Sequence, residues 1–253
     1  MIKKRESKKA QVTLFLILGI LVVSSIFIYF IWIQPTFIIR SPTSLGFEGC
    51  INKYIDESVN ELALSGGYLE SVFSYNYNNI DYPYFCYTNE HYTPCMVYNP
   101  SILKNFENNL KIMLSPKIQE CYDYSIQDLQ SKGFEVEQGN VEFDLFIKPS
   151  NIEVEVKAPI TVDNSLSYQD FLINHPSNLE NLLYLASQIV YMEIDGLDID
   201  TSVFNYLNPE LKFTSFKTSE ETTLYTIEDK QSQTKFRFAT RSYVFPAGYF
   251  GEI

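Results

Sequence analysis

The residues whose chemistry most constrains this chain are its four cysteines, Cys50, Cys86, Cys95 and Cys121. Four cysteines can pair in three ways, and no CxxC motif or His/Cys spacing indicates a zinc site. If the cysteines lie outside a reducing cytosol, two disulfides are expected, with zinc ligation or free thiols as the alternatives.

A second candidate for chemistry is the stretch 68–99, which is rich in Tyr and Asn. Aromatic rings that carry a hydroxyl can stack on a sugar or bind a protein partner. The alternative is that these tyrosines pack on their own domain. We expect an ordered loop with short extended pieces here, and its candidate ligand surface consists of Tyr82, Tyr84, Tyr87 and Tyr92.

No residue pattern indicates catalysis or a cofactor. The two histidines, His91 and His175, lack the H-E-x-x-H and G-x-S-x-G settings, and no glycine-rich phosphate loop occurs. Acidic residues are plentiful, but nothing selects the carboxylate pair of a glycosidase. The acidic stretch 193–200 lacks the residue order of a calcium loop, so we expect a helix-end turn there, with calcium as the alternative. The sequence therefore predicts no enzyme, cofactor or metal site.

Charge narrows the class of partner. The chain has 19 basic and 31 acidic residues, and residues 1–33 hold five and one of these. The remaining 14 basic and 30 acidic residues give residues 34–253 a net charge of −16. Nucleic acid and anionic lipid surfaces are disfavoured, because binding them requires a basic footprint. Cations, other proteins and neutral glycans remain, and the charge can also serve solubility alone.

Near the start of the chain, residues 12–33 form an apolar segment that contains no charge. As a helix it reaches about 33 Å, enough to cross a hydrocarbon core of about 30 Å. Five basic residues lie in the preceding leader, residues 1–11, and the positive-inside rule places that leader in the cytoplasm. We expect a single-pass cell-membrane protein anchored in lipid through 12–33, with a linker at 34–45 and the rest outside the cell. A buried core helix is the alternative.

The junction from Lys8 to Thr13 resembles the class III signal of archaeal type IV pilins and archaellins. In that family a prepilin-type peptidase cuts just before the apolar helix, after a basic and a small residue. The resemblance implies cleavage between Ala10 and Gln11, after which the apolar helix could pack with copies of itself in a filament core. Phe15 departs from the pattern, because pilin-like chains often carry Glu at that position. An uncut anchor is the alternative.

Apolar residues at steps of three and four predict three amphipathic helices in the exported part. The first is expected over residues 47–64 and ends at Gly66-Gly67. The second is expected to begin at Pro100, after Asn99 as its N-cap, and to continue to Gly133, with a kink or a second helix at Ser115-Pro116. The third covers residues 179–192, and one short helical turn follows at 203–207.

Cys50 and Cys121 both fall on the apolar face of a predicted helix, whereas Cys86 and Cys95 are near neighbours in sequence. We therefore expect a Cys50–Cys121 disulfide that joins two helices, and a Cys86–Cys95 disulfide that closes a short loop.

Alternating apolar and charged residues predict strands. Between residues 134 and 157 they predict a three-stranded antiparallel meander, and later strands are expected at 212–217, 223–228, 235–240 and 242–245. The solvated face of the meander would carry Glu142, Asp144, Glu153 and Glu155, with a cation site as the alternative. The fold class is α+β: one membrane helix, then a helical and meander part at 46–165 and a part with a helix and antiparallel strands at 166–253.

The order of features along residues 5–195 also resembles a family of single-pass exported proteins of small-genome archaea. The shared features are the basic leader, the QVT-type apolar helix, Cys50, Gly66-Gly67-Tyr68, Tyr82-Pro83-Tyr84, and Cys121 before Gly133-Phe134. The resemblance implies a cell-surface location and disulfides, and it carries no biochemical activity.

These expectations favour an exported, membrane-anchored cell-surface protein with a structural or interaction role, which includes a pilin-like role. The alternative is an exported binding module that recognises a glycan or a protein through the tyrosine-rich stretch. The expected partners are membrane lipid, copies of the chain and other surface proteins, and nucleic acid is not among them.

Overall fold

The computed structural model describes residues 19–24, 42–70, 73–163, 166–197 and 199–245. The chain forms two compact units, Met1–Pro42 and Thr43–Ile253. In the first unit, residues 19–24 are helical and exposed. The rest of the expected anchor 12–33, the leader with Ala10 and Gln11, and residues 34–41 of the expected linker lie outside the described residues. Among the helices that the structure describes, none is long and apolar enough for a membrane crossing.

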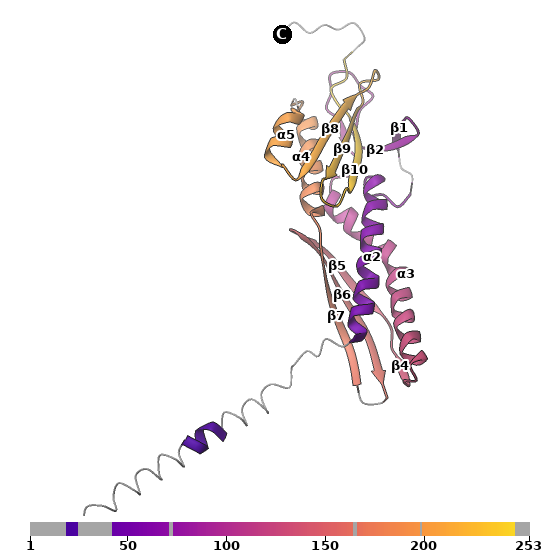
Figure 1. Cartoon of the computed structure of the whole chain (residues 1–253). Coiled ribbons are helices and arrows are strands. Elements are labelled where there is room, and N and C mark those ends of the chain that lie inside the picture. Colours follow the sequence, from indigo (N-terminus) through magenta and orange to yellow (C-terminus); the bar gives the residue numbers. More distant parts are fainter. Residues whose placement is uncertain (1–18, 25–41, 71–72, 164–165, 198, 246–253) are drawn as a thin grey trace, which may run out of the picture. The chain divides into compact units, whose positions relative to one another are not determined.

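The second unit is an α+β body, as the sequence predicted (Figure 1). Its helices are α2 (Pro42–Leu64), α3 (Ile102–Ser131), α4 (Leu179–Ile194) and α5 (Thr201–Leu207). Its strands are β1 (Ser74–Tyr77), β2 (Ile80–Tyr87), β3 (Met96–Val97), β4 (Val136–Gln138), β5 (Glu142–Lys148), β6 (Asn151–Val162), β7 (Leu166–Pro176), β8 (Leu211–Lys217), β9 (Thr223–Asp229) and β10 (Lys235–Arg241).

The strands form two sheets. In the six-stranded sheet the order is β1-β2-β10-β9-β8, with β3 also paired to β2. The β2–β10 pair is parallel, and the other pairs of this sheet are antiparallel. Because β2 and β10 come from opposite ends of the body, the parts expected at 46–165 and 166–253 share one sheet and belong to one unit.

The stretch 68–99 is more regular than the ordered loop that the sequence predicted. It contains β1, β2 and β3, and β2 lies inside the six-stranded sheet. Three consecutive residues of β2, Tyr84, Phe85 and Cys86, are buried. A strand that is covered on both faces loses the alternation by which strands are recognised, so the pattern did not reveal β2.

The expected three-stranded meander is a four-stranded antiparallel sheet with a different order. Strand β6 pairs with β5 through its first half and with β4 through its second half, so β4 does not neighbour β5. Strand β7, which the sequence did not predict, pairs along β6 on the other side. The meander prediction was wrong in this respect because β6, at 12 residues, is long enough to take two partners in succession on one edge.

Two helix predictions also need correction. Helix α3 is one helix of 30 residues with Pro116 inside it, so no second helix starts there. Proline has no N–H group, so the Ile112 carbonyl loses the donor that residue 116 would normally supply. Both residues are exposed, and water can donate to that carbonyl instead. Helix α2 begins at Pro42, inside the expected linker 34–45, because proline is well suited to the first turn of a helix.

Helix α2 ends as predicted at Gly66-Gly67. Gly66 has a φ of +64°, and Gly67 N–H donates to the Leu62 carbonyl at 2.8 Å. A Cβ on Gly66 would come within 2.5 Å of Pro83 Cγ, so the close approach of β2 also requires glycine.

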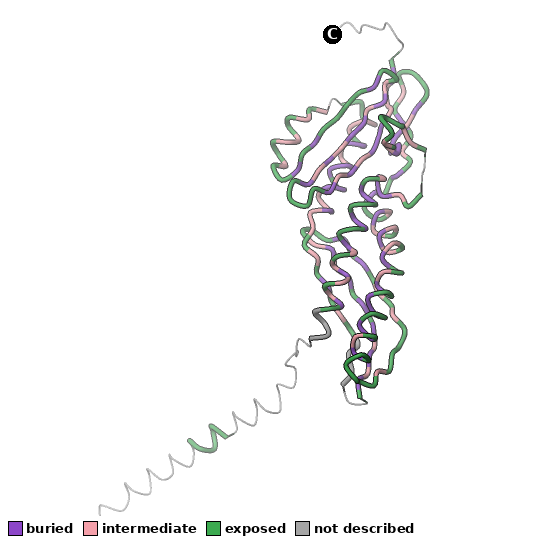
Figure 2. The backbone as a smooth tube through the Cα atoms, turned by 45° about the vertical axis from the view of Figure 1, so that its right-hand side comes forward, coloured by how far each residue is buried: buried purple, intermediate pink, exposed green. Residues whose placement is uncertain are grey.

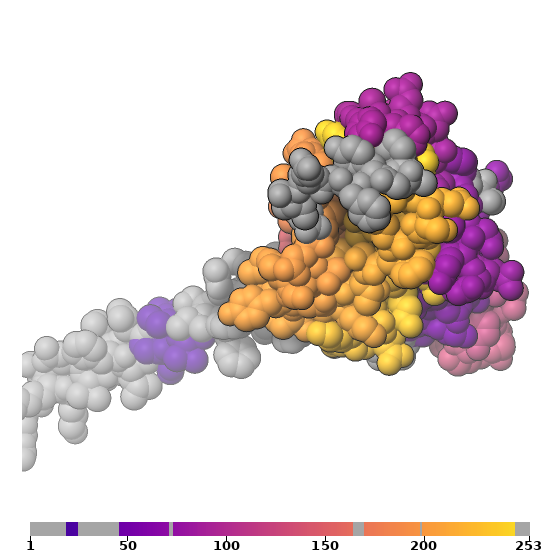
Figure 3. Space-filling view, turned by 90° about the horizontal axis from the view of Figure 1, so that it is seen from above, coloured from indigo at the N-terminus to yellow at the C-terminus, as the bar shows by residue number. Residues whose placement is uncertain are grey.

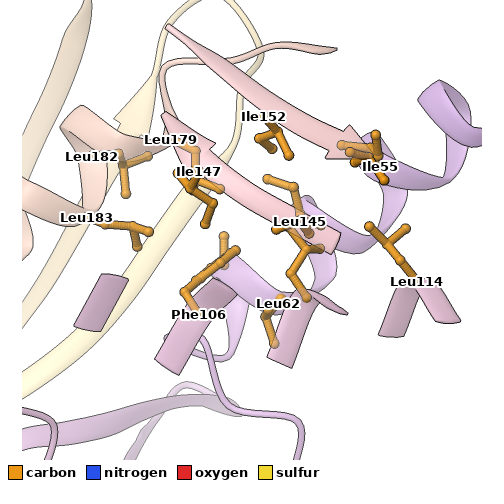
Figure 4. Close-up of a cluster of buried hydrophobic side chains, with 14 of the residues drawn as sticks. Ile55, Leu62, Phe106, Leu114, Leu145, Ile147, Ile152, Leu179, Leu182 and Leu183 are labelled. Atoms are coloured by element: carbon orange, nitrogen blue, oxygen red, sulfur yellow. The ribbon is translucent and has the colours of Figure 1, made fainter. Parts of the chain in front are cut away.

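The core of the body lies where helices α2, α3 and α4 meet the two sheets. Figure 4 shows its side chains converging from α2 (Ile55, Leu62), α3 (Phe106, Leu114), β5 (Leu145, Ile147), β6 (Ile152) and α4 (Leu179, Leu182, Leu183). All of these are buried. Figure 2 shows buried and exposed positions succeeding each other along α2 and α3, as one-sided packing requires.

Both expected disulfides are present. Cys50 of α2 pairs with Cys121 of α3, with 5.9 Å between their Cα atoms. Cys86 of β2 pairs with Cys95, just before β3, with 5.3 Å between their Cα atoms. The described chain contains no free cysteine, which removes the zinc and free-thiol alternatives from this structure.

Candidate functional site: an aromatic cluster on the six-stranded sheet

Three of the four tyrosines predicted as a ligand surface lie together on the face of the six-stranded sheet that turns away from the main core. Tyr84 packs there with Leu224 and Ala239, and partly buried tyrosines surround it. We call this group the aromatic cluster and define it as Phe73, Tyr75, Tyr82, Tyr84, Tyr87 and Tyr98.

Strand geometry places these rings side by side. Alternation along β2 sends Tyr82 and Tyr84 to one face and Phe85 to the core. Tyr75 of β1 is the cross-strand partner of Tyr82. On β9 and β10, Leu224 and Ala239 pack against Tyr84 from the same face of the sheet.

 Ala239 is the parallel-strand neighbour of Tyr84, and Leu224 is the antiparallel partner of Ala239.

The rings hold one another in defined orientations. Phe73 stacks on Tyr84 with ring centroids 4.7 Å apart, and it meets Tyr87 edge-on at 4.8 Å. Tyr84 and Tyr87 are also in edge contact, at 4.8 Å. Phe73 and Tyr98 are each about half exposed (52%), whereas Tyr84 is only 6% exposed. The cluster is therefore a pre-arranged platform with a buried centre and an accessible rim.

The cluster consists of neutral rings with one cation beside them. The Tyr84 hydroxyl lies 2.9 Å from Thr222 Oγ1, and burial raises the pKa of Tyr84 above its ordinary value, so the phenol stays protonated. The Arg241 guanidinium lies 5.6 Å from the Tyr87 ring centroid. Its Nε and Nη1 atoms donate to the carbonyls of Glu220 and Thr88, which hold the guanidinium in place and leave its positive charge beside the cluster.

Sequence reasoning found part of this site. Tyr92, the fourth predicted residue, lies outside the cluster and has its ring 5.7 Å from that of Phe245. Tyr84 is too buried to offer its ring to a ligand and supports the others. Phe73, Tyr75 and Tyr98 were missed as ligand residues, although all three lie in the tyrosine-rich stretch or beside it. Leu224 and Ala239 could not be found, because only the β2–β10 pairing brings them there.

Two acidic residues of the stretch 193–200, in which calcium was the alternative, are used structurally. Glu193 accepts a hydrogen bond from the Tyr225 hydroxyl, and Asp200 accepts one from Ser202 N–H at 2.8 Å as the cap of α5. Burial, with Glu193 beside it, raises the pKa of Tyr225 far above the usual range. The stretch 193–200 thus ends α4 and starts α5. Among the described residues, no group of His, Cys, Asp and Glu is arranged to hold a metal.

The solvated face of the four-stranded sheet carries ion pairs. Asp144 lies 2.7 Å from Lys111 Nζ, whose hydrogen bond lowers the pKa of that carboxyl, and Glu153 pairs with Lys148. Glu142 and Glu155 are exposed on the same face. These carboxylates lie on the wet side of the sheet, as predicted.

His175 belongs to a polar cavity of about 460 Å³ beside α2. Its Nε2 atom lies 3.0 Å from Asp56 Oδ1, and its Nδ1 atom lies 3.1 Å from Asn52 Oδ1. Both ring nitrogens are thus occupied by α2 side chains, so the imidazole ties β7 to α2 and has no nitrogen left to activate a nucleophile.

The fold and the site define a disulfide-bonded α+β body that displays an aromatic cluster. The chain matches no protein-family model, no curated protein and no solved structure.

Proposed function

We propose that this chain is an exported cell-surface interaction protein, held in the cell membrane by residues 12–33. The observation that carries the proposal is that all four cysteines, which follow the apolar segment, are joined in two disulfides. Such bonds persist in an oxidising environment. In this proposal the basic leader stays in the cytoplasm, and the body Thr43–Ile253 lies outside.

A pilin-like role is a narrower form of this proposal. It rests on the resemblance of Lys8 to Thr13 to a class III signal, and it requires cleavage between Ala10 and Gln11. A mature chain whose N-terminal sequence begins at Gln11 would support that form, and an intact leader would favour a simple anchor.

The orientation predicts opposite results from the two faces of the membrane. Protease added to intact spheroplasts should degrade the body and spare a fragment around residues 12–33. Protease added to inverted vesicles should leave the body whole and remove only the leader. Immunoblotting with an antibody against the body measures the result of both treatments. A cytoplasmic marker protein, which stays intact in unbroken spheroplasts, controls for lysis. A body that survives in spheroplasts but is degraded in inverted vesicles would refute the proposal.

The aromatic cluster favours a second candidate function, a binding module for neutral glycans. Its rim rings, Phe73 and Tyr98, offer apolar faces for stacking on a sugar ring. The net charge of −16 on residues 34–253 disfavours an anionic polymer. Arg241 places a single cation beside the cluster, which is small against this net negative charge. A neutral carbohydrate fits these properties better than a charged one.

Binding to an array of neutral oligosaccharides tests this function. Phe73→Ala and Tyr98→Ala should each weaken binding about 3- to 10-fold, since one aromatic contact contributes about 0.5–1.5 kcal/mol. Tyr124→Ala is the matched control, because Tyr124 is 68% exposed on α3, outside the cluster. Equal binding by all three variants, or no binding by the parent chain, would contradict a glycan role.

A further inference from the structure

Strand β8 is the edge of the six-stranded sheet, and a side chain from α5 occupies the backbone hydrogen-bonding groups of Phe213 on its outer side. It pairs with β9 in a regular antiparallel register. On its other side, the Asn205 side chain of α5 accepts from Phe213 N–H at 2.8 Å and donates to the Phe213 carbonyl at 2.9 Å. Asn205 therefore imitates one residue of a neighbouring strand. Figure 3 shows the region of α5 and β8, in orange, at the surface of the body.

The pairing of Asn205 fixes which groups of β8 point outward. In an antiparallel ladder, residues alternate between those that bond to the partner strand and those that point away from it. Phe213 points away from β9, so Ser215 and Lys217 do too, and the ladder bonds belong to Thr214 and Phe216. In the part of the chain that the structure describes, the outward N–H and C=O groups of Ser215 have no partner. Ser215 is exposed.

A cavity of about 380 Å³ borders this open stretch. Its lining includes Ser215 and Lys217 of β8, Leu197 and Ile199 from the connection between α4 and α5, and Tyr225 of β9. Leu197 is 55% exposed. Polar side chains, among them Glu193 and Ser242, also line the cavity and make its lining more polar than apolar. The site thus combines a backbone donor and acceptor with space for a polar side chain.

We propose that Ser215–Lys217 is a docking edge for a short extended peptide of a partner protein, which adds a strand beside β8 and places a polar side chain in this cavity. The chemistry of the edge selects the occupant, because an alternating N–H and C=O pair is complemented by another extended backbone. The open stretch covers only about 10 Å of strand. A stable dimer of globular chains needs about 800 Å² per partner, so a short segment fits this edge and a second copy does not. The inference is independent of the membrane anchoring and of glycan binding.

The test uses the full chain in detergent micelles and a phage-displayed library of random heptapeptides. Enriched peptides should share a polar residue at one position, the one whose side chain enters the cavity. Ser215→Pro removes the outward N–H without removing a ladder bond, which proline tolerates on an edge strand. It should weaken binding about 5- to 10-fold, the range expected for one lost hydrogen bond. Ser215→Ala keeps the backbone and is the matched control, with unchanged binding.

A second readout does not depend on the folding of any variant. Methylating the alternate backbone nitrogens of an enriched peptide should abolish its binding, while methylating the intervening ones should not. Enrichment that is absent, or that survives both Ser215→Pro and backbone methylation, overturns the proposal. Enrichment that appears only after deletion of residues 246–253 would name this chain's own segment as the occupant, and a chain dimer dissolved by Ser215→Pro would name a second copy; either overturns the partner assignment.

Discussion

Replacing Cys50 and Cys121 together by alanine is expected to lower the free energy of unfolding of the body by about 4 kcal/mol. The bond joins α2 to α3 across 71 residues of sequence, so its loss frees a long loop in the unfolded chain. Urea denaturation of the unit Thr43–Ile253, produced in an oxidising compartment and followed by far-ultraviolet circular dichroism, measures the change.

The other disulfide supplies the matched control. Cys86 and Cys95 are nine residues apart, and the same loop-closure argument gives about 2.5 kcal/mol for their replacement by alanine. The ranking of the two double variants is the test. A larger loss from the Cys86–Cys95 pair would show that local packing around β2, and not loop length, decides the contribution of these bonds.

Phe85→Ala is expected to cost about 3–5 kcal/mol, the usual range for removing a fully buried phenylalanine. The Phe85 ring is 0% exposed, stacks on Phe238 at 4.9 Å and meets Phe236 edge-on at 5.8 Å. Truncation would leave a cavity where β2 and β10 pack against α4, and these rigid rings can fill little of it. Thermal unfolding of the same unit measures the loss.

Phe73→Ala is the control that separates the removal of an aromatic ring from the removal of a buried one. Phe73 lies in the same tyrosine-rich region but is 52% exposed in the aromatic cluster, so its removal should cost about 1 kcal/mol or less. Equal losses for the two variants would mean that the aromatic cluster, and not the core face of β2, stabilises this part of the sheet.

Some elements of this fold could be predicted from the sequence, and others could not. Helices with one apolar face were predicted because their periodicity is local: α4 was predicted to within two residues, and α2 was predicted at its end but not at its start. The pairing of Cys50 with Cys121 followed from the same periodicity, since both lie on apolar helical faces. Strand β2 has no such signal, because the main core and α4 cover one of its faces and the aromatic cluster covers the other.

The candidate site divides in the same way. Tyrosine density marked the right region, but density does not tell which rings point together. That depends on the register of β2 with β10 and on its pairing with β1, which the sequence does not encode locally. The open edge at Ser215 could not be predicted from the sequence. It depends on the Asn205 side chain of α5, which hydrogen-bonds to the backbone of Phe213 and leaves that of Ser215 unpaired.

The parallel pairing of β2 with β10 also sets when this body can fold. Tyr84 neighbours Ala239, so the six-stranded sheet cannot close until β10 has been made. At about 5–20 residues per second, ribosomes need roughly 8 to 30 s to travel from one strand to the other. During that interval β2 has no β10 to pair with, and the six-stranded sheet stays open. Late closure of this sheet is consistent with the export that we propose, because an exported chain can cross the membrane before the sheet forms.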